Sequence, residues 1–428
     1  MQKVLAIILA GGRGERLSIL AQERAKPAIP FAGKYRIIDF TLSNCVNSGI
    51  FNVAVLTQYQ PLSLADHIGV GAEWGFATPD REIRLLQPYL ARDEGRDWYK
   101  GTADAVYQNF EFIEEQGSEM VFILSADHVY KMDYSKMLKV LQDTKADVVL
   151  GVTRMPDEEL HRFGTVILDI EGRVISFHEK VKQPKSNFVS MGVYLFKKDI
   201  LQKCLEEDVQ NMVSRQDFGR NILPRLVDSD KVFTCYFDGY WRDVGTVHGY
   251  WQANMDLLEI SPQLLFSTDW TIYTKEEEGP PAIVSRTGDI VNSLISNGCV
   301  IEGQVTHSIL SPGVKVAEGA VVKDSIIMSD SVVGERSVVD YSILDKEIVV
   351  EADCYLGFGT DLQANHKEAN TLNSGITVVG KGCRVPAGVK VGRNCAIYGG
   401  AIESDFLTLE IKSGETVRPR RRRAIRKA

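Results

Sequence analysis

The stretch GVKVAEGAVVKDSIIMSDSVVGERSVVDYSILDKEIVV, residues 313–350, carries an apolar residue at every sixth position. The row consists of Val314, Ala320, Ile326, Val332, Val338, Leu344 and Val350, and the period resumes at Cys383, Val389, Cys395 and Ala401. A period of this kind gives one short strand and one corner per repeat, three repeats per coil, with small or aliphatic residues pointing inward. It predicts a parallel β-helix. The alternative is a β-sandwich whose alternation falls into the same register by chance.

The sequence before residue 260 has a different rhythm, in which short apolar runs alternate with stretches of helical pattern. The runs at 4–9, 53–56, 120–124 and 148–152 are expected to be strands, and 102–115 and 134–145 are expected to be helices. This pattern is typical of βα units on a mostly parallel sheet, as in a Rossmann-like α/β domain.

The two rhythms divide the chain into two domains. We expect an α/β domain over residues 1–260, a linker over 261–285 that contains the acidic and proline-rich run at 276–281, and the β-helix over 286–428. The polar sequence at 360–375 breaks the repeat and is expected to be an insertion between coils.

Composition narrows the class of protein. The chain has 428 residues, 44% of them apolar and 25% charged, and a formal net charge of −8, which argues against a nucleic-acid-binding surface. Its seven cysteines are scattered and never spaced as C-x-x-C, which favours a reducing cytosol over a disulfide framework or a zinc site. No apolar run is long enough for a membrane span, and the apolar start at 4–9 leads into glycines rather than a cleavage site. These features predict a soluble cytoplasmic protein.

A glycine-rich loop follows the first predicted strand, in the sequence LAGGRGERL at residues 9–17. Glycines allow backbone N–H groups to approach phosphate oxygens closely. The loop is neither a P-loop nor a complete dinucleotide fingerprint, because Leu17 stands where the third glycine of that fingerprint would be. Three cations lie in or near the loop, Arg13, Arg16 and Lys26, which suits a triphosphate substrate that releases pyrophosphate. On the loop alone, a tight strand-to-helix turn without a ligand is an equal alternative.

The motif L-x-G-G-x-G-x-R-L followed by Lys-Pro resembles that of the sugar-1-phosphate nucleotidylyltransferases. Longer motifs, which run in order from residue 4 to about residue 410, resemble the ADP-glucose pyrophosphorylase family: KPAIPFAGKYRIIDF at 26–40, SNC at 43–45, TQYQ at 57–60, WYKGTADA at 98–105 and YWRDVGT at 240–246. The resemblance implies a nucleotidyltransferase domain followed by a left-handed parallel β-helix. It also implies the reaction of ATP with α-D-glucose 1-phosphate to give ADP-glucose and pyrophosphate, on the route to glycogen or starch.

The resemblance assigns the ATP side of the site. Gly11, Gly12, Gly14, Arg16 and Lys26 would bind the phosphates, with Arg16, Lys26 and Asp127 as catalytic residues, and Asp127 and Asp243 would bind Mg²⁺. Asp127 follows a predicted buried strand, and so lies at the sheet edge where α/β proteins bind ligands. Without the resemblance, each aspartate is better explained as a loop cap. His128 is expected to be structural.

The resemblance also assigns the sugar-phosphate side, to Tyr99, Gly164, Glu179, Lys180 and Ser190. From the residues alone, Glu179 and Lys180 are better explained as a solvated surface pair. Two departures from the family stand out. The family usually has the sequence Glu-Lys-Pro, whereas in this chain the proline after Lys180 comes only at position 184. The stretch 89–95 also lacks the glutamine that the family has near the adenine. Base choice is therefore less firmly predicted than reaction type.

Family members are usually tetramers regulated by metabolites, so we expect a homotetramer with an anionic allosteric effector. Lys34 and Arg36 match an effector-site motif, and the basic tail from Arg418 to Lys427 is either an anion site or a solvated end. Three rival functions remain: a related enzyme that uses another base or sugar phosphate, a bifunctional enzyme with an acyltransferase β-helix, and a non-catalytic regulatory subunit.

Overall fold

The computed structural model describes residues 3–88, 98–259 and 263–420, and it divides into two compact units. The sheet unit comprises Met1–Gly12, Ile38–Trp241 and Thr268–Tyr273, and the coil unit comprises Arg13–Ile37, Arg242–Ser267 and Thr274–Ala428. The coil unit therefore contains two segments from the N-terminal 260 residues in addition to the C-terminal part of the chain. Among the described residues, no helix is long and apolar enough to cross a membrane.

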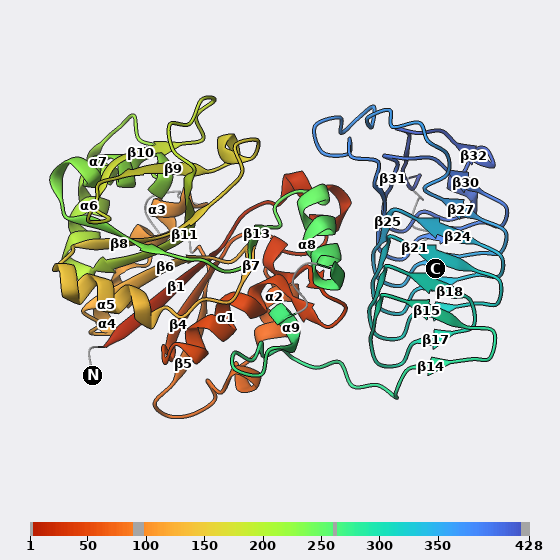
Figure 1. Ribbon diagram of the computed structural model, residues 1–428, viewed down its shortest axis with the longest axis horizontal. Coiled ribbons are helices and arrows are strands. Elements are labelled where there is room, and N and C mark those ends of the chain that lie inside the picture. The colour runs from red at the N-terminus through yellow and green to blue at the C-terminus, as the bar shows by residue number, and fades with distance from the viewer. Residues whose placement is uncertain (1–2, 89–97, 260–262, 421–428) are drawn as a thin grey trace, which may run out of the picture. The chain divides into compact units, whose positions relative to one another are not determined.

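The sheet unit is built on a mixed sheet (Figure 1) with the strand order β10-β9-β11-β6-β1-β4-β5, in which β8 pairs with β11 and β12 pairs with β8. Its strands are β1 Val4–Ala10, β4 Asn52–Thr57, β5 Glu82–Leu86, β6 Met120–Ser125, β8 Val148–Arg154, β9 Gly164–Leu168, β10 Val174–Glu179, β11 Phe188–Lys197 and β12 Val232–Tyr236. Strands β6, β1, β4 and β5 run parallel, whereas β11 is antiparallel to β6, β8 and β9. The α/β prediction is confirmed, and the four predicted strands are β1, β4, β6 and β8.

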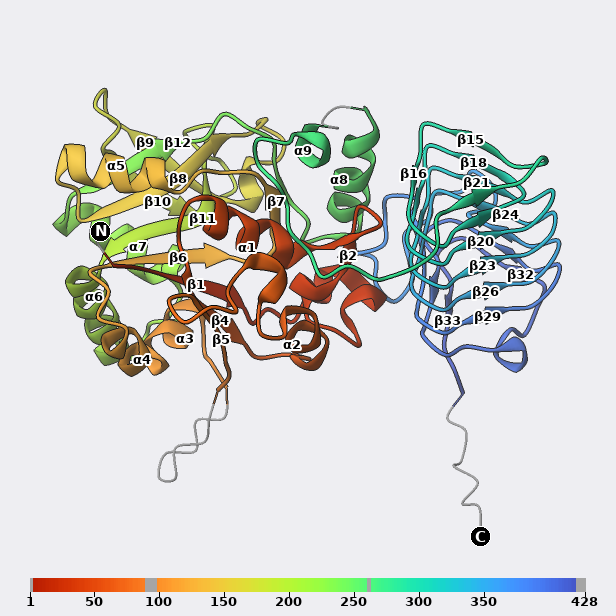
Figure 2. The ribbon, with the colours of Figure 1, turned by 90° about the horizontal axis from the view of Figure 1, so that it is seen from below.

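Helices cover the sheet on both sides. They are α1 Ile37–Asn47, α2 Leu62–Ile68, α3 Thr102–Gln108, α4 Phe110–Glu115, α5 Ser135–Thr144, α6 Lys198–Gln210 and α7 Leu223–Ser229, with shorter turns η3 Ala72–Trp74, η4 Leu160–Arg162 and η5 Phe218–Ile222. Helix α5 packs on β8 and β12, and Figure 2 shows it on the opposite side of the sheet from α4 and α6. Parallel strands covered on both faces read as continuous apolar runs, which is why the sequence reveals them.

The predicted helix over 102–115 is wrong in one respect, because it is interrupted at Asn109. This residue has φ −109° and ψ 19°, and its side-chain amide donates hydrogen bonds to the Ala105 carbonyl at 2.8 Å and to the Tyr99 hydroxyl at 3.0 Å. Asparagine competes with the backbone for hydrogen bonds in this way, and so it favours helix ends over helix interiors.

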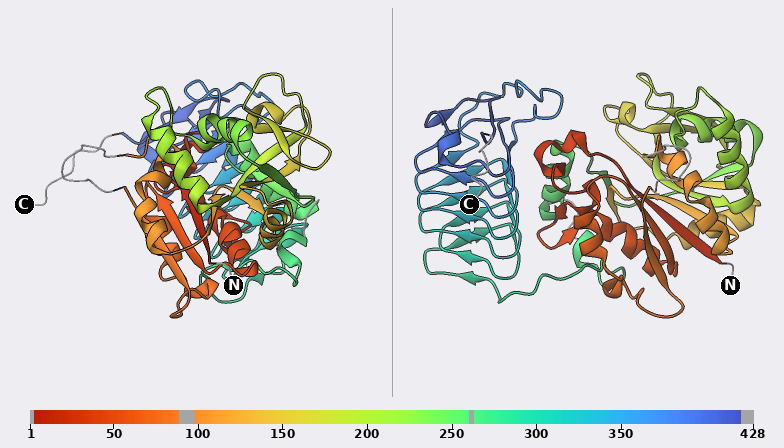
Figure 3. Two further views of the ribbon diagram at one scale, coloured as in Figure 1. Left: turned by 90° about the vertical axis from the view of Figure 1, so that its left-hand side faces the viewer. Right: turned by 180° about the vertical axis from the view of Figure 1, so that it is seen from behind.

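The coil unit contains the parallel β-helix, with stacked coils (Figure 3) whose described strands form three parallel sheets. The first sheet contains β14 Ile283–Val284, β17 Val300–Ile301, β20 Lys315–Val316, β23 Val332–Val333, β26 Val349–Val350 and β29 Arg384–Val385. The second contains β15 Asp289–Val291, β18 Gln304–Thr306, β21 Val321–Lys323, β24 Val338–Asp340, β27 Tyr355–Leu356, β30 Lys390–Val391 and β32 Glu410–Ile411. The third contains β16 Leu294–Ile295, β19 Ile309–Leu310, β22 Ile326–Ile327, β25 Ser342–Leu344, β28 Thr377–Val379, β31 Ala396–Ile397 and β33 Thr416–Val417. The β-helix prediction is confirmed, with an arrangement consistent with a left-handed coil.

The strict six-residue row does not describe every inward position. Stacked residues of the central coils lie 17 positions apart, as in the pairs Val316 with Val333 and Ile327 with Leu344. One side of each such coil is therefore a residue shorter than a strict period of six requires. As a result Val332 and Val338 are partly exposed, and their neighbours Val333 and Val339 are buried instead.

The short side of the coil ends in a stack of serines. Ser325, which is fully buried, donates its hydroxyl to the Lys323 carbonyl at 2.6 Å and accepts the Ser342 N–H at 3.1 Å. The residue before each stacked serine has a positive φ, 47° at His307 and Asp324 and 48° at Tyr341. The serine hydroxyls thus satisfy backbone groups that the tight corner removes from the strand ladders.

The expected insertion between coils is confirmed, because residues 357–376 separate β27 from β28 and include no strand in the described structure. The coil unit also contains η6 Glu403–Asp405, and its two N-terminal segments supply η1 Glu15–Ala21, η2 Lys26–Ala28, β2 Pro30–Phe31, β3 Tyr35–Arg36, α8 Val247–Glu259 and α9 Gln263–Phe266. All seven cysteines are free and buried, and burial raises the pKa of the Cys383 thiol to about 11.

Candidate active site

The glycine-rich loop begins at the end of β1 and continues into η1. Gly11 and Gly12 end the first segment of the sheet unit, and the coil unit starts at Arg13. Gly14 adopts φ 68°, and a Cβ there would lie 2.7 Å from the Cβ of Ala21. Both the conformation and the close approach require glycine at this position.

Three of the predicted site residues meet around Gly245 in the coil unit. Lys26 is buried and its ammonium lies 3.6 Å from the Asp243 carboxylate, which also accepts the Gly245 N–H at 2.8 Å. A Cβ on Gly245 would lie 2.8 Å from Lys26 Nζ and 3.2 Å from an Arg16 guanidinium nitrogen. Two cations and one carboxylate thus converge where glycine leaves room, an arrangement suited to an anionic ligand.

Asp127 lies just beyond β6 in the sheet unit. Ser125 donates its hydroxyl to this carboxylate at 2.6 Å, and His128 Nε2 lies 3.3 Å from it. The His128 ring packs against Trp241, with ring centroids 4.9 Å apart. His128 thus contacts both Asp127 and Trp241, and its assignment as a structural residue stays a prediction.

Another group of predicted residues lies where β9 and β10 pair. Gly164 pairs with Glu179, and a Cβ on Gly164 would lie 2.7 Å from a Glu179 carboxylate oxygen. A Cβ on Gly219 would lie 2.6 Å from the same carboxylate, and no motif in the sequence marks this glycine. Lys180 lies 3.1 Å from Glu179 and has φ 50°, so this ion pair occurs at a sharp turn of the chain.

Ser190 and Tyr99 are held separately in the same unit. The Ser190 hydroxyl is nearly buried and lies 3.3 Å from the hydroxyl of Tyr194. Tyr99 is fixed by Asn109 through its hydroxyl and by Gln58, which donates to its carbonyl at 3.4 Å. The stretch 89–95, on which the prediction of the base depends, lies outside the described residues.

The residues expected at an effector site make ion pairs and hydrogen bonds within the coil unit. Lys34 lies 2.6 Å from Glu276, and this hydrogen bond lowers the pKa of the Glu276 carboxyl. Arg36 donates to the Ala28 carbonyl at 2.5 Å. Lys346, which sequence reasoning missed, lies 3.3 Å from Glu277. Glu276 and Glu277, in the acidic run of the predicted linker, thus each form an ion pair with a lysine.

The β-helix holds the segment that carries Lys26. Arg24 lies two residues before Lys26, and its guanidinium donates to the Asp345 carboxylate at 2.8 Å. Both side chains are almost fully buried, with exposed fractions of 6% and 4%. A buried charge is tolerated only with such a partner, so this pair fixes the segment against the β-helix.

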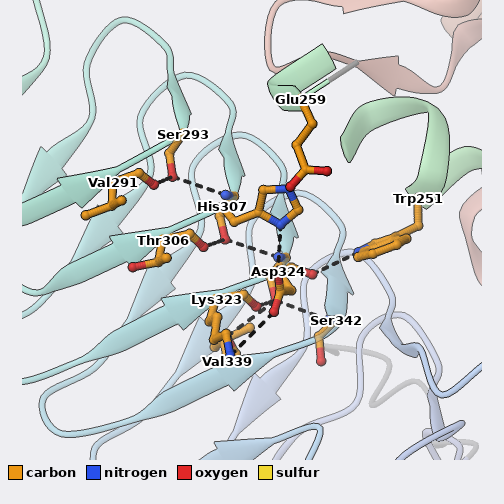
Figure 4. Close-up of polar contacts among 12 residues, drawn as sticks. Trp251, Glu259, Val291, Ser293, Thr306, His307, Lys323, Asp324, Val339 and Ser342 are labelled. Carbon is orange, nitrogen blue, oxygen red and sulfur yellow. Dashed lines mark hydrogen bonds and ion pairs between the residues drawn. The ribbon is translucent and has the colours of Figure 1, made fainter. Parts of the chain in front are cut away.

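The β-helix also holds the helix that follows Asp243. Trp251 on α8 donates its indole N–H to the Asp324 carbonyl at 2.8 Å, and its ring lies 4.5 Å from that of Tyr341. Figure 4 shows His307 between two carboxylates, with Nδ1 2.6 Å from Asp324 and Nε2 3.3 Å from Glu259 on α8. The corner residues with positive φ are therefore the ones that contact α8.

Comparison of the sequence with known proteins identifies the family of the chain. The sequence profile described as nucleotidyl transferase matches residues 5–260, and the profile described as GlmU-like, C-terminal hexapeptide matches 280–379. The chain is 50% identical to a glucose-1-phosphate adenylyltransferase of Thermomicrobium roseum over 98% of each chain. It is 44% identical to one of Acetivibrio thermocellus over 97% of this chain and 98% of the other, and 47% identical to one of Bacillus cereus over 82% and 93%.

The chain belongs to the glucose-1-phosphate adenylyltransferase family. It is therefore a nucleotidyltransferase enzyme, and the resemblance drawn from the motifs is confirmed. Two of the motifs that carry the resemblance, the one that contains Lys26 and the one that contains Asp243, bring their residues together at Gly245. Gly245 itself stood in a quoted motif and could have been singled out there.

The buried pair predicts a large cost for removing one partner. Arg24→Met should lower the free energy of unfolding by about 3–5 kcal/mol, because it leaves the Asp345 carboxylate buried without its cation. Arg24→Met combined with Asp345→Leu should recover most of that loss. Urea unfolding of the three proteins measures both effects.

A matched control is the exposed pair of Lys381 and Glu347, 3.3 Å apart. Lys381→Met should cost no more than about 1 kcal/mol, since exposed pairs contribute little. Equal losses for Arg24→Met and Lys381→Met would contradict the anchoring role of Arg24.

Proposed function

We propose that this enzyme transfers an adenylyl group from ATP to α-D-glucose 1-phosphate, giving ADP-glucose and pyrophosphate. The observation that carries the proposal is the convergence of Arg16, Lys26 and Asp243 around Gly245. Relatives with this activity in their names match the chain over nearly its full length. The glucose 1-phosphate oxygen would attack the α-phosphorus in line with the departing pyrophosphate, with no covalent enzyme intermediate.

On the ATP side, the loop would bind the phosphates and the cations would offset their charge. Backbone N–H groups at Gly11, Gly12 and Gly14 can approach phosphate oxygens closely, because no Cβ intervenes. Arg16 is exposed and Lys26 is buried, so a ligand that reaches both would draw charge into a site of low dielectric. Charge that develops on the departing pyrophosphate is stabilised most strongly in such surroundings.

Asp127 and Asp243 are proposed to bind Mg²⁺. Trp241 packs against His128, the neighbour of Asp127, and Asp243 follows Trp241 by two residues. Two carboxylates are the protein ligands that Mg²⁺ commonly takes beside substrate phosphates, so the donor set fits. When bound, the ion would neutralise charge on the α-phosphate and the pyrophosphate. Ser125, which donates to Asp127, would orient that carboxylate.

On the sugar side, Lys180 is proposed to bind the phosphate of glucose 1-phosphate, with Gly164, Glu179, Ser190 and Tyr99 around the sugar. Lys180 is half exposed beside Glu179. A cation there would lower the repulsion between two anionic reactants. Glu179, fitted between two glycines, has little freedom to move, which suits a hydrogen bond to a sugar hydroxyl.

We further propose an anionic effector that acts through Lys34 and Arg36, a homotetramer and a cytoplasmic location on the route to glycogen or starch. Seven free, buried thiols agree with a reducing compartment. The catalytic domain is proposed to span 1–260 and the β-helix 286–428, joined by 261–285. The rival in which the β-helix is an acyltransferase would rest on its two histidines, His307 and His366, of which His307 lies between the carboxylates of Asp324 and Glu259.

The reaction is tested by measuring pyrophosphate release with glucose 1-phosphate and each of ATP, UTP, GTP and CTP, with Mg²⁺ present. ATP should give the highest kcat/KM, because the family's reaction uses adenine. A preference for UTP or GTP would replace the proposed base. The absence of release with all four nucleotides would favour a regulatory subunit.

Asp127→Asn tests the metal assignment. The amide removes one of two proposed anionic ligands, so kcat should fall by about a hundredfold or more while the far-UV spectrum and melting temperature stay near those of the wild type. Asp143→Asn, an exposed aspartate on α5, is the matched control and should leave kcat unchanged. Near-normal turnover of Asp127→Asn would contradict the assignment.

The basic tail tests the effector proposal. A chain that ends at Arg420 retains Arg418, which donates to the Tyr398 hydroxyl at 2.9 Å, and removes the cations beyond it. Activation by a sugar bisphosphate should be lost in this shortened chain while basal pyrophosphate release stays the same. Equal activation of both chains would exclude residues 421–428 from the effector site.

A further inference from the structure

A carboxylate from the insertion between coils contacts η1, the short helical segment that carries Arg16. Glu368 Oε2 accepts a hydrogen bond from the Ser18 hydroxyl at 2.5 Å, although the two residues are 350 positions apart. The other oxygen of the same carboxylate accepts a hydrogen bond from the Tyr398 hydroxyl. Both oxygens are thus used, one on η1 and one on the β-helix.

The backbone around Glu368 is fixed by a buried amide. Asn365 is fully buried, and its side-chain oxygen accepts the N–H groups of Lys367 and Glu368, each at 3.0 Å. Its side-chain nitrogen donates to the carbonyls of Asn394 and Glu415, at 3.0 and 3.2 Å. Glu368 is therefore held by the adjoining coils, even though it lies in an insertion without strands.

Ser18 has a backbone conformation that needs such support. It adopts φ 52° and ψ −129° inside η1, a region that residues other than glycine seldom occupy. Conformations of this kind persist only where the surroundings hold them. The next residue, Ile19, is buried against the β-helix, since a Cβ on Gly380 would lie 2.6 Å from its Cγ2 atom.

The N-terminal part of η1 lies beside open space. A cavity of about 480 Å³ is lined by Arg13, Glu15 and Ser18 on one side and by Glu368, Asn370 and Thr371 on the other. Arg13 and Glu15 are mostly exposed, and their charged ends lie 3.6 Å apart. The N-terminal part of η1 therefore has few packing contacts on this side. The Ser18–Glu368 hydrogen bond joins two residues that line the cavity.

We propose that Glu368 is a positioning residue that holds Ser18, and through Leu17, the one residue between them, also Arg16, in the orientation that receives the phosphates of ATP. This role rests on the proposed function. The hydrogen bond from Ser18 to a carboxylate fixes the unusual φ of Ser18, and that φ sets the direction in which the chain leaves Arg16. Tyr398 and Asn365 keep the carboxylate in place.

Amide hydrogen exchange of the full-length protein without ligands tests the contact independently of activity. In Glu368→Ala, amides of residues 15–21 should exchange about tenfold faster than in the wild type, the effect of losing one hydrogen bond to a charged group. The control is Glu410→Gln, an exposed glutamate on β32, which should exchange like the wild type. Unchanged exchange in Glu368→Ala would overturn the proposal.

Steady-state kinetics then separate positioning from simple stability. Glu368→Ala should lower kcat/KM for ATP about tenfold, with KM for glucose 1-phosphate unchanged and a melting temperature close to that of the wild type. Glu368→Gln, which can still accept the Ser18 hydrogen bond, should recover part of the loss. Ser18→Ala combined with Glu368→Ala should be no worse than either single variant, because both break the same contact.

A lower melting temperature with normal kcat/KM for ATP, or additive losses in the double variant, would overturn the positioning role. An inactive wild-type enzyme would instead refute the proposed reaction, and hydrogen exchange would still decide whether Glu368 holds η1.

Discussion

A charge buried without a partner costs several kcal/mol, and this constraint ties the segment around Arg24 to the β-helix. Arg24 has an exposed fraction of 6%, and its carboxylate partner, Asp345, lies in a coil 321 residues further along the chain. Neither group can leave the other without losing the interaction that makes its burial tolerable. The position of the segment around Arg24, which includes Lys26, therefore depends on whether the β-helix has formed.

The β-helix holds a further segment of the coil unit besides the one around Arg24. Its corner at His307, Asp324 and Tyr341 holds α8, which starts four residues after Asp243. Helix α8 in turn holds the turn between β2 and β3, because Asn254 accepts the Ala32 N–H at 2.9 Å. Segments from residues 13–37 and 242–267 thus belong to the same compact unit as the coils. A rigid platform of this kind suits a site whose cations must be in place before the substrate arrives.

The sequence predicted well what depends on local pattern. Strands β1, β4, β6 and β8 are recognisable as continuous apolar runs, because nearly all of their residues are buried. The stacked coils are recognisable because apolar residues recur at a fixed spacing. The coil length of 17 residues was not predicted, because valine occupies both positions of the pairs Val332–Val333 and Val338–Val339. Only the structure shows that Val333 and Val339 are the buried members of these pairs. The break at Asn109 was missed because it depends on one side chain within an otherwise helical run.

The candidate site was predictable in its residue types, and far less so in its contacts. Arg16, Lys26 and Asp243 stand in the motifs that carry the family resemblance, whereas no motif marks Glu368 or Lys346, although Lys346 lies within the repeat at 313–350. Their partners, Ser18 and Glu277, are 350 and 69 residues away along the chain. No pattern within a window of the sequence carries such a pairing, because it arises only when the coils stack.

The side chains around Gly245 carry a small net charge compared with a triphosphate. Lys26 is buried and close to the Asp243 carboxylate, so part of its charge is already offset before any ligand binds. Arg16 adds a second cation, and the local sum is then a single positive charge. A triphosphate carries more negative charge than that sum can balance in a site of low dielectric. In the proposed reaction, the further positive charge would come from the Mg²⁺ ion for which Asp127 and Asp243 are the proposed ligands.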